Sequence, residues 1–472
     1  MSEVTNYGII SLIPVFLTLF LAFKTKDAVF ALIIGCISGV VISGVDPATG
    51  LSKLFQNALG NADFIWVMMI EVAIGIMIAF YFRVGAISAF ADWAVTKIRS
   101  RRSATGFTWL LGIFIFFSDY FSPLFSGPIA RPLTDKYKVS REKLAYLLDS
   151  GSAPVCTLVP LSGWAVYIAG LLKGYGPITN AGEGMTVFIK SIPYNFYGWF
   201  AVILAGLIAY NIIPDYGPMK KAELRAKNET KVIRDGATPL IGEELNQIQP
   251  IEGKKTNLLV YLFIPVLIII GIALSTFIVL GSTKILEAFF AAVMYQAIVM
   301  AIGGYFKGVK DGMDLAIKGI KGVLPAIMIL ALAYCINTIS KSLGAQTYII
   351  SVTKPWMSAG MLPIVVFITG ALISFFTGTS WGTYAILTPF ALPIAMNLSG
   401  GNVSPIVLAT IGAIVGGGCF GDHCSPVSDT TVLSSLGASS DHIDHVTTQL
   451  PYALTAAVLA SIIFVIVGTM FL

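Results

Sequence analysis

Ionisable and hydroxyl side chains gather in one short stretch near the C-terminal end of the chain, which reads CFGDHCSPVSDTTVLSS over 419–435. It places Asp422, His423, Ser425 and Asp429 between two hydrophobic runs, with Ser428 directly before the second aspartate. Carboxylate and hydroxyl oxygens are the ligands that hard cations prefer, and an interrupted helix adds free backbone carbonyls. A carboxylate also exchanges its cation for a proton. The stretch therefore predicts a site that binds sodium and protons.

Three more acids stand in apolar surroundings: Glu71 in MMIEVAIG, Asp119 in FFSDYFSP and Asp149 in LLDSGSAP. A charged side chain at the centre of a bilayer costs at least about 3 kcal/mol, so an acid there is a functional candidate. Hydroxyl residues accompany these acids or recur in a matching segment, TGTS. They are Ser118, Ser150, Ser152, Thr157, Ser162, Thr377, Thr379 and Ser380. We expect the acids and hydroxyls to share one ion site, with Glu71 as a further coupling acid.

Each of these residues also has a structural interpretation. Glu71 lies in a regular apolar run and could serve as a buried hydrogen-bonding group as well as a proton carrier. Asp149 could be hydrated at the end of its span, and Asp429 could be an acid that the dipole of a helix start favours. His423 could donate to a carbonyl, but its ordinary pKa near neutrality also allows a pH-responsive role.

Two motifs have a competing interpretation as metal or enzyme sites. Cys419, His423 and Cys424 resemble zinc ligands, but an adjacent His-Cys pair cannot easily reach one tetrahedral ion. The run DHIDH over 441–445 also resembles a ligand set, and we expect a solvated loop there. Asp422 and His423 beside Ser425 and Ser428 loosely resemble a nucleophile and base, yet neighbours at a helix break seldom have that geometry. The sequence therefore favours neither an enzyme nor a cofactor.

The composition is that of a polytopic membrane protein. Of 472 residues, 56% are hydrophobic and only 12% are charged, against about 25% charged in an ordinary soluble domain. Apolar runs near the roughly 20 residues of a membrane-spanning helix recur along the whole chain. We interpret the first, 8–23, as a retained span. The five cysteines lie in or beside apolar runs and do not suggest disulfides, and no basic and aromatic patch suggests nucleic acid.

One long polar stretch, 214–256, divides the chain into two similar halves and carries eight Lys or Arg and seven Asp or Glu residues. We therefore predict a first repeat over 1–213, a cytoplasmic linker over 214–256 and a second repeat over 257–472. Apolar segments are expected at 8–23, 28–45, 62–82, 105–133, 143–172 and 192–213, then at 257–280, 285–305, 323–340, 361–397, 403–436 and 447–471. Local likeness between FFSDYFSP (116–123) and FFTGTSWG (375–382), and between VCTLVPLSG (155–163) and GDHCSPVSD (421–429), supports a duplication.

Two segments of each half are predicted to be interrupted at membrane depth. The runs 105–133 and 361–397 have polar, turn-like centres, and an arm of 13 residues reaches only about 20 Å, so we expect re-entrant hairpins. The runs 143–172 and 403–436 are expected to be spans unwound in the middle. In the second, Gly416–Gly418 and Gly421 should end one half-helix, and Ser425 with Pro426 should begin the next. The fold class is then all-α, with two inverted repeats of about five transmembrane helices plus one hairpin.

The positions of basic residues agree with this topology. With the N-terminus outside, 24 Lys and Arg residues fall in inside loops and six in outside loops, as the positive-inside rule requires. An even total of ten spans also puts the C-terminus outside. We expect a multi-pass protein of a bacterial inner membrane, with an amphipathic arm at 83–98 on its inner surface.

The motif FGDHCSPVSDTTVLSS resembles the signature of the NhaC-type sodium/proton antiporter family, and the layout of two halves resembles the wider superfamily of elevator ion carriers. The motif covers about 16 residues, whereas the length and the two-half layout fit nearly the whole chain. The resemblance implies a moving transport domain made of hairpins and unwound helices, against a scaffold that forms a homodimer. It leaves the substrate open between Na⁺ and H⁺ alone and a small carboxylate or amino acid coupled to them.

These observations lead to two hypotheses of function. The first is a secondary active antiporter that exchanges sodium for protons, with Asp119 and Asp422 as the main carboxylates. The alternative is sodium- or proton-coupled transport of a small organic acid or amino acid, as in malate/lactate exchange, because the segment Thr377–Ser380 carries no acid of its own. A pump is not indicated because the chain lacks a phosphate-binding G-x-x-x-x-G-K-[ST] motif, and a channel is a minor alternative.

Overall fold

The computed structural model describes residues 7–25, 27–116, 119–160, 162–240, 248–251, 253–280 and 284–470. Over these residues the regular structure is helical, with two isolated β-bridges. The first half contains η1 (Gly8–Leu12), α1 (Ile13–Thr25), α2 (Ala28–Ile42), α3 (Pro47–Leu59), α4 (Ala62–Val84), α5 (Ala86–Lys97), α6 (Arg101–Phe114), α7 (Phe121–Lys136), α8 (Arg141–Ser150), α9 (Ala153–Cys156), α10 (Gly163–Leu172), α11 (Ala181–Ser191), η2 (Ile192–Tyr194) and α12 (Phe196–Ala209).

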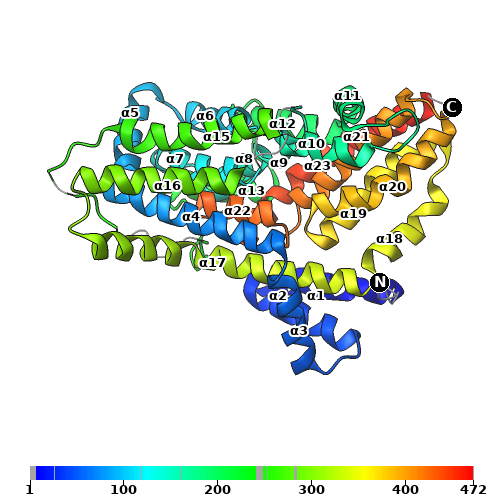
Figure 1. Ribbon diagram of the computed structural model, residues 1–472, viewed down its shortest axis with the longest axis horizontal. Coiled ribbons are helices and arrows are strands. Elements are labelled where there is room, and N and C mark those ends of the chain that lie inside the picture. The colour runs from blue at the N-terminus through cyan, green and yellow to red at the C-terminus, as the bar shows by residue number, and fades with distance from the viewer. Residues whose placement is uncertain are drawn as a thin grey trace.

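The second half begins after α13 (Gly217–Asn228), a helix inside the predicted linker. It contains the π-helical turn η3 (Leu259–Phe263), α15 (Ile264–Leu280), α16 (Ile285–Ile302), α17 (Val309–Ser342), α18 (Ala345–Thr353), η4 (Lys354–Trp356), η5 (Ala359–Met361), α19 (Leu362–Thr377), α20 (Ser380–Leu398), α21 (Pro405–His423), α22 (Asp429–Ala438) and α23 (His442–Met470). Figure 1 shows α4, α15, α16 and α17 in one part of the molecule and α19, α20, α21 and α23 in another.

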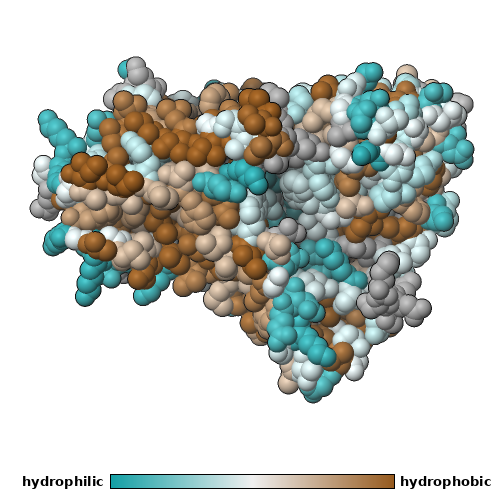
Figure 2. Space-filling view, in the orientation of Figure 1, coloured by the Kyte–Doolittle hydropathy of each residue, from teal (hydrophilic) through white to brown (hydrophobic). Residues whose placement is uncertain are grey.

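Length and hydropathy make this an integral membrane protein. Among the described residues, six helices are long and apolar enough to cross a membrane, or eight if two bent pairs each count as one span. The surface agrees: α15 and α16 expose Ile278, Val279, Met294, Ile298 and Ile302. Figure 2 shows this hydrophobic area in brown over the same part of the molecule. Side chains of this kind on the outside of a helical bundle face lipid.

The helix α21 has the opposite environment, because 83% of its hydrophobic segment is buried inside the protein. Its glycines explain how it packs so closely. A Cβ on Gly417 would lie 2.3 Å from the Phe367 carbonyl oxygen, and one on Gly421 would lie 2.2 Å from that of Ala371. Both partners belong to α19, so the missing side chains let the two backbones touch. These glycines lie inside a helix that continues to His423, so the prediction that they end it is wrong.

Helix breaks lie where the sequence predicts them. The hairpin segments turn between α6 and α7 and between α19 and α20, where Gly378 has φ +64°. The other two segments are interrupted at 157–162 and at 424–428, and the first also at Gly151 and Ser152. Ser162 and Ser428 are the N-caps after these breaks, each accepting a hydrogen bond from the backbone N–H three residues later. The predicted N-cap Ser425 is therefore three residues too early.

The linker packs against the helices that carry the breaks. Lys143 of α8, whose side chain is only 1% exposed, lies 2.9 Å from Asp215 and 3.4 Å from Glu223 of the linker. Arg225 binds Glu142 at 2.9 Å. Burial raises the pKa of Asp215, although the Lys143 ammonium acts in the opposite direction. The linker is thus fixed to the start of α8.

A second linker contact reaches the run DHIDH, which begins α23. Arg234 binds Asp444 at 2.7 Å, and this bond raises the pKa of the Arg234 guanidinium. Asp441 accepts hydrogen bonds from the backbone N–H and the hydroxyl of Thr238. His442 and His445 are 2% and 0% exposed. The prediction of a solvated loop is therefore wrong, because the linker covers this run and the histidines turn inward.

Candidate functional site

Asp422 is the best-defined acid of the predicted ion site. It lies one residue before the end of α21 and is 1% exposed. Its Oδ2 accepts hydrogen bonds from Ser380 Oγ at 3.0 Å and Thr430 Oγ1 at 3.3 Å, while Ser428 Oγ lies 3.0 Å from Thr430 Oγ1. The ligand set thus joins the break at 424–428 to the start of α20. Its other oxygen, Oδ1, has no hydrogen-bond partner among the described residues.

Asp119 and Asp429 are two further carboxylates near Asp422. Asp429 Oδ2 accepts a hydrogen bond of 2.8 Å from the hydroxyl of Tyr120, next to Asp119 in the turn between α6 and α7. The charge of Asp429 acts on both Asp119 and Asp422. Asp119 is 4% exposed, and its Oδ2 has no partner among the described residues. Ser118, its predicted companion, lies outside those residues.

Asp119 Oδ2 and Asp422 Oδ1 have lone pairs that no described hydrogen-bond donor engages, and such carboxylate oxygens suit a cation as ligands. Buried polar atoms are paired in more than nine cases of ten, so two orphaned carboxylate oxygens near a third acid require an explanation. Hydroxyls from Ser380, Ser428 and Thr430 complete an all-oxygen donor set. Such a set suits a hard cation such as sodium, or protons on the same carboxylates, and not a soft transition metal.

Asp149 lies at the end of α8 and belongs to a different hydrogen-bond group. Its Oδ1 accepts from Ser434 Oγ at 3.2 Å, and its Oδ2 accepts from Gln449 Nε2 at 2.7 Å. Nε2 of His445 lies 3.8 Å from the same Oδ2. Asp149 is 0% exposed, so it is not a hydrated acid at the membrane edge. Both of its oxygens are engaged by protein donors, which leaves it less available to a cation than Asp422.

The ring of His423 is held on both sides. Nδ1 lies 2.7 Å from the Tyr197 hydroxyl and Nε2 lies 3.2 Å from Ser150 Oγ. The hydroxyl of Ser425 instead donates to the Phe375 carbonyl at 2.8 Å. Ser428 Oγ lies against Thr430 Oγ1, so neither serine of the enzyme alternative is hydrogen-bonded to His423. Within the described ranges, no cluster of three or more His, Cys, Asp or Glu residues is positioned to hold a metal ion.

The remaining predicted hydroxyls bind local backbone rather than the acids. Ser152, Thr157, Ser162 and Thr377 each donate to a carbonyl three to six residues earlier, and Thr379 is the N-cap of α20. They stabilise the breaks and turns around the site. Their role as direct ligands stays a prediction.

Five contributors were not predicted from the sequence: Tyr120, Tyr197, Thr430, Ser434 and Gln449. Thr430 stands beside Asp429 in the quoted motif, so its type and position were visible. Gln449 was also visible as a polar residue inside a predicted span, which is rare and usually functional. Tyr197 carried no signal, because tyrosine is common in apolar runs and its contact to His423 joins residues 226 positions apart.

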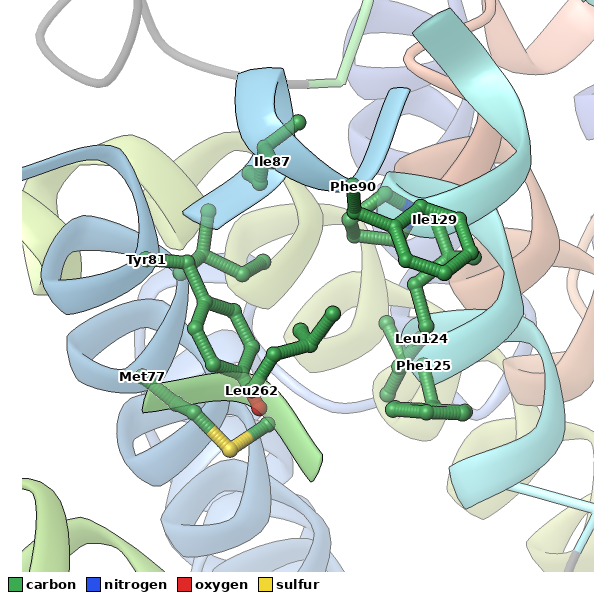
Figure 3. A pocket seen from close by; sticks show the side chains of 10 residues that line it. Met77, Tyr81, Ile87, Phe90, Leu124, Phe125, Ile129 and Leu262 are labelled. Atoms are coloured by element: carbon green, nitrogen blue, oxygen red, sulfur yellow. The ribbon is translucent and has the colours of Figure 1, made fainter. Parts of the chain in front are cut away.

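Glu71 lies away from these groups, in the middle of α4. It is 0% exposed, and neither of its carboxylate oxygens has a hydrogen-bond partner among the described residues. One turn along the helix, Gly75 touches Gly319 of α17. An apolar pocket lies farther along α4, between α5, α7 and η3, where Met77, Tyr81, Phe90, Leu124 and Leu262 point toward one another (Figure 3). Its lining offers no acid or base, so it is not the ion site.

A model of the Na+/H+ antiporter family matches residues 155–469, which include both helix breaks and the hairpin between α19 and α20. An uncharacterized protein of Haemophilus influenzae is 34% identical over 97% of this chain and 90% of its own.

Two relatives with named activities match part of the chain. The malate-2H(+)/Na(+)-lactate antiporter of Bacillus subtilis is 30% identical over 44% of this chain and 43% of its own. The Na(+)/H(+) antiporter NhaC of Alkalihalophilus pseudofirmus is 27% identical over 43% of each. Because the family model covers about two thirds of the residues, the chain belongs to the Na+/H+ antiporter family, a family of secondary transporters.

Proposed function

We propose that this protein exchanges sodium for protons across a bacterial inner membrane, with Asp422 as the central ligand. The observation that carries the proposal is the half-satisfied carboxylate of Asp422, with one oxygen bound by two hydroxyls and the other without a hydrogen-bond partner in the part of the chain that the structure describes. Such a carboxylate is oriented in advance and still has capacity for a ligand. Asp119, Asp429, Ser380 and Thr430 supply the other oxygens.

The exchange follows from competition for the same oxygens. Three carboxylates gathered in one site, two of them buried, repel one another, so the empty and unprotonated state is costly. Either sodium or protons remove that cost. When the site takes up protons sodium leaves, and the reverse holds on the other side of the membrane. Asp149 is bound by Ser434 and Gln449, and we assign it to protons rather than to sodium.

We infer that transport proceeds by an elevator-like movement. The broken helices and hairpins would move together against a scaffold containing α4, α15, α16 and α17. Two inverted repeats, both termini outside and a homodimeric scaffold belong to the same proposal. The corresponding breaks at 157–162 and 424–428 and the 24 to 6 distribution of Lys and Arg support it.

The test is sodium-driven proton flux in proteoliposomes. We expect Asp422→Asn to abolish the flux, because the amide keeps the shape but loses the charge. Asp92→Asn, at an exposed acid of α5, is the matched control and should retain wild-type flux. Undiminished flux in the Asp422 variant would contradict the assignment.

A second candidate function is coupled transport of a small carboxylate. The observation that favours it is the hairpin tip at Thr377–Ser380, which has no acid and faces Asp422 through Ser380. A substrate carboxylate could bind hydroxyls and a sodium ion there without repulsion from the tip. Thermal stabilisation of the purified protein by amino acids or dicarboxylates, only when sodium is present, would distinguish this function from simple ion exchange.

A further inference from the structure

A chain of buried polar side chains continues from Asp149 toward the end of α22. It consists of Gln449 and His445 of α23, Ser435 of α22, and His442 at the start of α23. All are at most 2% exposed. The proposed ion exchange uses none of these four, so their hydrogen bonds call for a separate account.

The orientation of Gln449 fixes one proton of His445. Nε2 of Gln449 donates to two acceptors, Asp149 Oδ2 and the His423 carbonyl, so its other end must be the amide oxygen. That oxygen lies 2.9 Å from His445 Nε2. An amide oxygen only accepts, so His445 Nε2 carries a hydrogen.

The same reasoning applies to His442. Its Nε2 lies 2.8 Å from the carbonyl oxygen of Pro426, inside the break at 424–428. A carbonyl only accepts, so His442 Nε2 also carries a hydrogen. If both imidazoles are neutral, both Nδ1 atoms are therefore bare and need a donor.

Ser435 cannot satisfy both rings. Its Oγ lies 3.1 Å from His442 Nδ1, 2.8 Å from His445 Nδ1 and 2.9 Å from the Thr431 carbonyl oxygen, and a hydroxyl has a single hydrogen. With two neutral rings, at least one of the two contacts to a ring joins two acceptors. One additional proton removes this conflict when Ser435 turns its hydrogen from the Thr431 carbonyl to one ring, because the other ring, protonated at Nδ1, then donates to Ser435.

The charge of that proton has a partner close by. Asp149 Oδ2 lies 3.8 Å from His445 Nε2, so an imidazolium at His445 faces a carboxylate. We propose that His442, Ser435 and His445 bind one proton as a shared imidazolium paired with Asp149, in a proton site separate from the sodium site at Asp422. Its part in coupling rests on the proposed exchange of sodium for protons, but its existence does not.

Other charged groups surround this proton site at greater distance. They are His423 of α21, Asp441 and Asp444 at the base of α23, Arg234 of the linker, and Arg131 and Arg141, which bind the end of α22 at Ser439 and Ala438. Arg234 neutralises Asp444, and Arg141 is paired with Asp135 at 2.6 Å. Asp441 is next to His442 and accepts from Thr238, whereas Asp149 lies beside His445, so we assign the balancing charge of an imidazolium at His445 to Asp149.

Histidine NMR tests the inference without transport. The chain has only three histidines, so ¹⁵N-histidine labelling of the full-length protein gives a spectrum of three rings. We expect one ring with both nitrogens protonated on acidification toward pH 5, and loss of that signal in Asp149→Asn and in Ser435→Ala. Asp444→Asn, beside His445 but paired with Arg234, should retain it. Three neutral rings throughout the range would overturn the inference.

Transport measurements then distinguish a failure of this inference from a failure of the proposed function. With His445→Gln, we expect sodium-driven proton flux to fall at least tenfold while sodium/sodium exchange stays within twofold of wild type. Unchanged proton flux in this variant would exclude a role of the site in coupling. Absence of sodium-driven proton flux in the wild type would instead refute the proposed function, and the NMR result would stand by itself.

Discussion

At the scale of single residues, the distinguishing feature of this protein is a set of buried acids whose carboxylate oxygens receive different numbers of hydrogen bonds from the chain. Asp149 has donors on both oxygens, Asp422 on one, and Glu71 on neither among the described residues. A carboxylate with full donor support is held in place, whereas one with free oxygens needs a ligand or a proton. This gradation ranks Asp422 above Asp149 as a cation ligand.

Ser380→Ala should weaken sodium binding without destroying the site. The substitution removes one of two hydroxyl donors to Asp422 Oδ2, a net change of about 0.5–1.5 kcal/mol. We expect the sodium concentration for half-maximal exchange to rise roughly two- to tenfold. Ser399→Ala is the control, because Ser399 lies after the same helix and donates only to backbone carbonyls. Equal effects of the two substitutions would contradict the ligand role of Ser380.

Residue types in the site could be predicted from sequence, but most of their partners could not. An acid in an apolar run is visible at once because its burial is so costly. The bond from Tyr120 to Asp429 joins positions 309 apart, and that from Ser434 to Asp149 joins positions 285 apart. Such pairs depend on how helices pack, which periodicity does not encode.

At the scale of elements, the backbone of the α19–α20 hairpin tip is in direct contact with the backbone of the helix break at 424–428. Gly378 has a left-handed φ of +64°, and a Cβ there would lie 2.3 Å from the Val427 carbonyl oxygen. Ser425 adds a hydrogen bond to the Phe375 carbonyl, one turn before the tip. Position 378 therefore requires glycine for two reasons: the left-handed turn conformation and the lack of space for a Cβ beside Val427.

Substitution of two glycines separates these two requirements. Gly378 and Gly400 have nearly the same φ, +64° and +63°, but a Cβ on Gly400 would meet nothing within 4 Å. We expect Gly378→Ala to lower the melting temperature of the purified protein and abolish exchange, whereas Gly400→Ala suffers only the strain of its conformation, about 1 kcal/mol. Similar melting temperatures for the two variants would show that contact with Val427 is unimportant.

The positions of the breaks were predictable, whereas their limits were not. Polar and turn-forming residues inside apolar runs indicated both hairpin tips and both interrupted spans. Gly416–Gly418 and Gly421 were misread, because in sequence a glycine that permits helix contact looks the same as one that ends a helix. The difference lies in what the glycine faces, which is α19, 50 residues away, for Gly417 and Gly421, Asn195 for Gly416 and Tyr384 for Gly418.

At the scale of the whole molecule, the linker is part of the folded body. It bonds to α6 through Arg101 and Glu223, to α8 through Lys143, and to α23 through Arg234 and Asp444. The charge pattern of 214–256 predicted a polar linker but not its attachment. Opposite charges that pair across 72 or more positions look in sequence like an ordinary solvated stretch.

Lys143→Met should destabilise the protein by about 3 kcal/mol, because it leaves Asp215 without its buried cation, whereas Glu223 keeps its pair with Arg101. We expect a lower melting temperature, partly restored when Asp215 is also replaced by asparagine. Lys231→Met removes an exposed pair with Asp235 and should produce no measurable shift. An unchanged melting temperature of Lys143→Met would mean that this contact of the linker contributes little to stability.

The contact between Gly378 and Val427 also determines how this transporter can be engineered. If the proposed elevator-like movement carries the α19–α20 tip and the break at 424–428 together, a covalent tether between them should leave turnover intact, because their backbones are already in contact. A tether from either of them to α17, which the proposal places in the scaffold, should stop turnover. A probe or cross-link at this contact would then report movement of the proposed transport domain without blocking it.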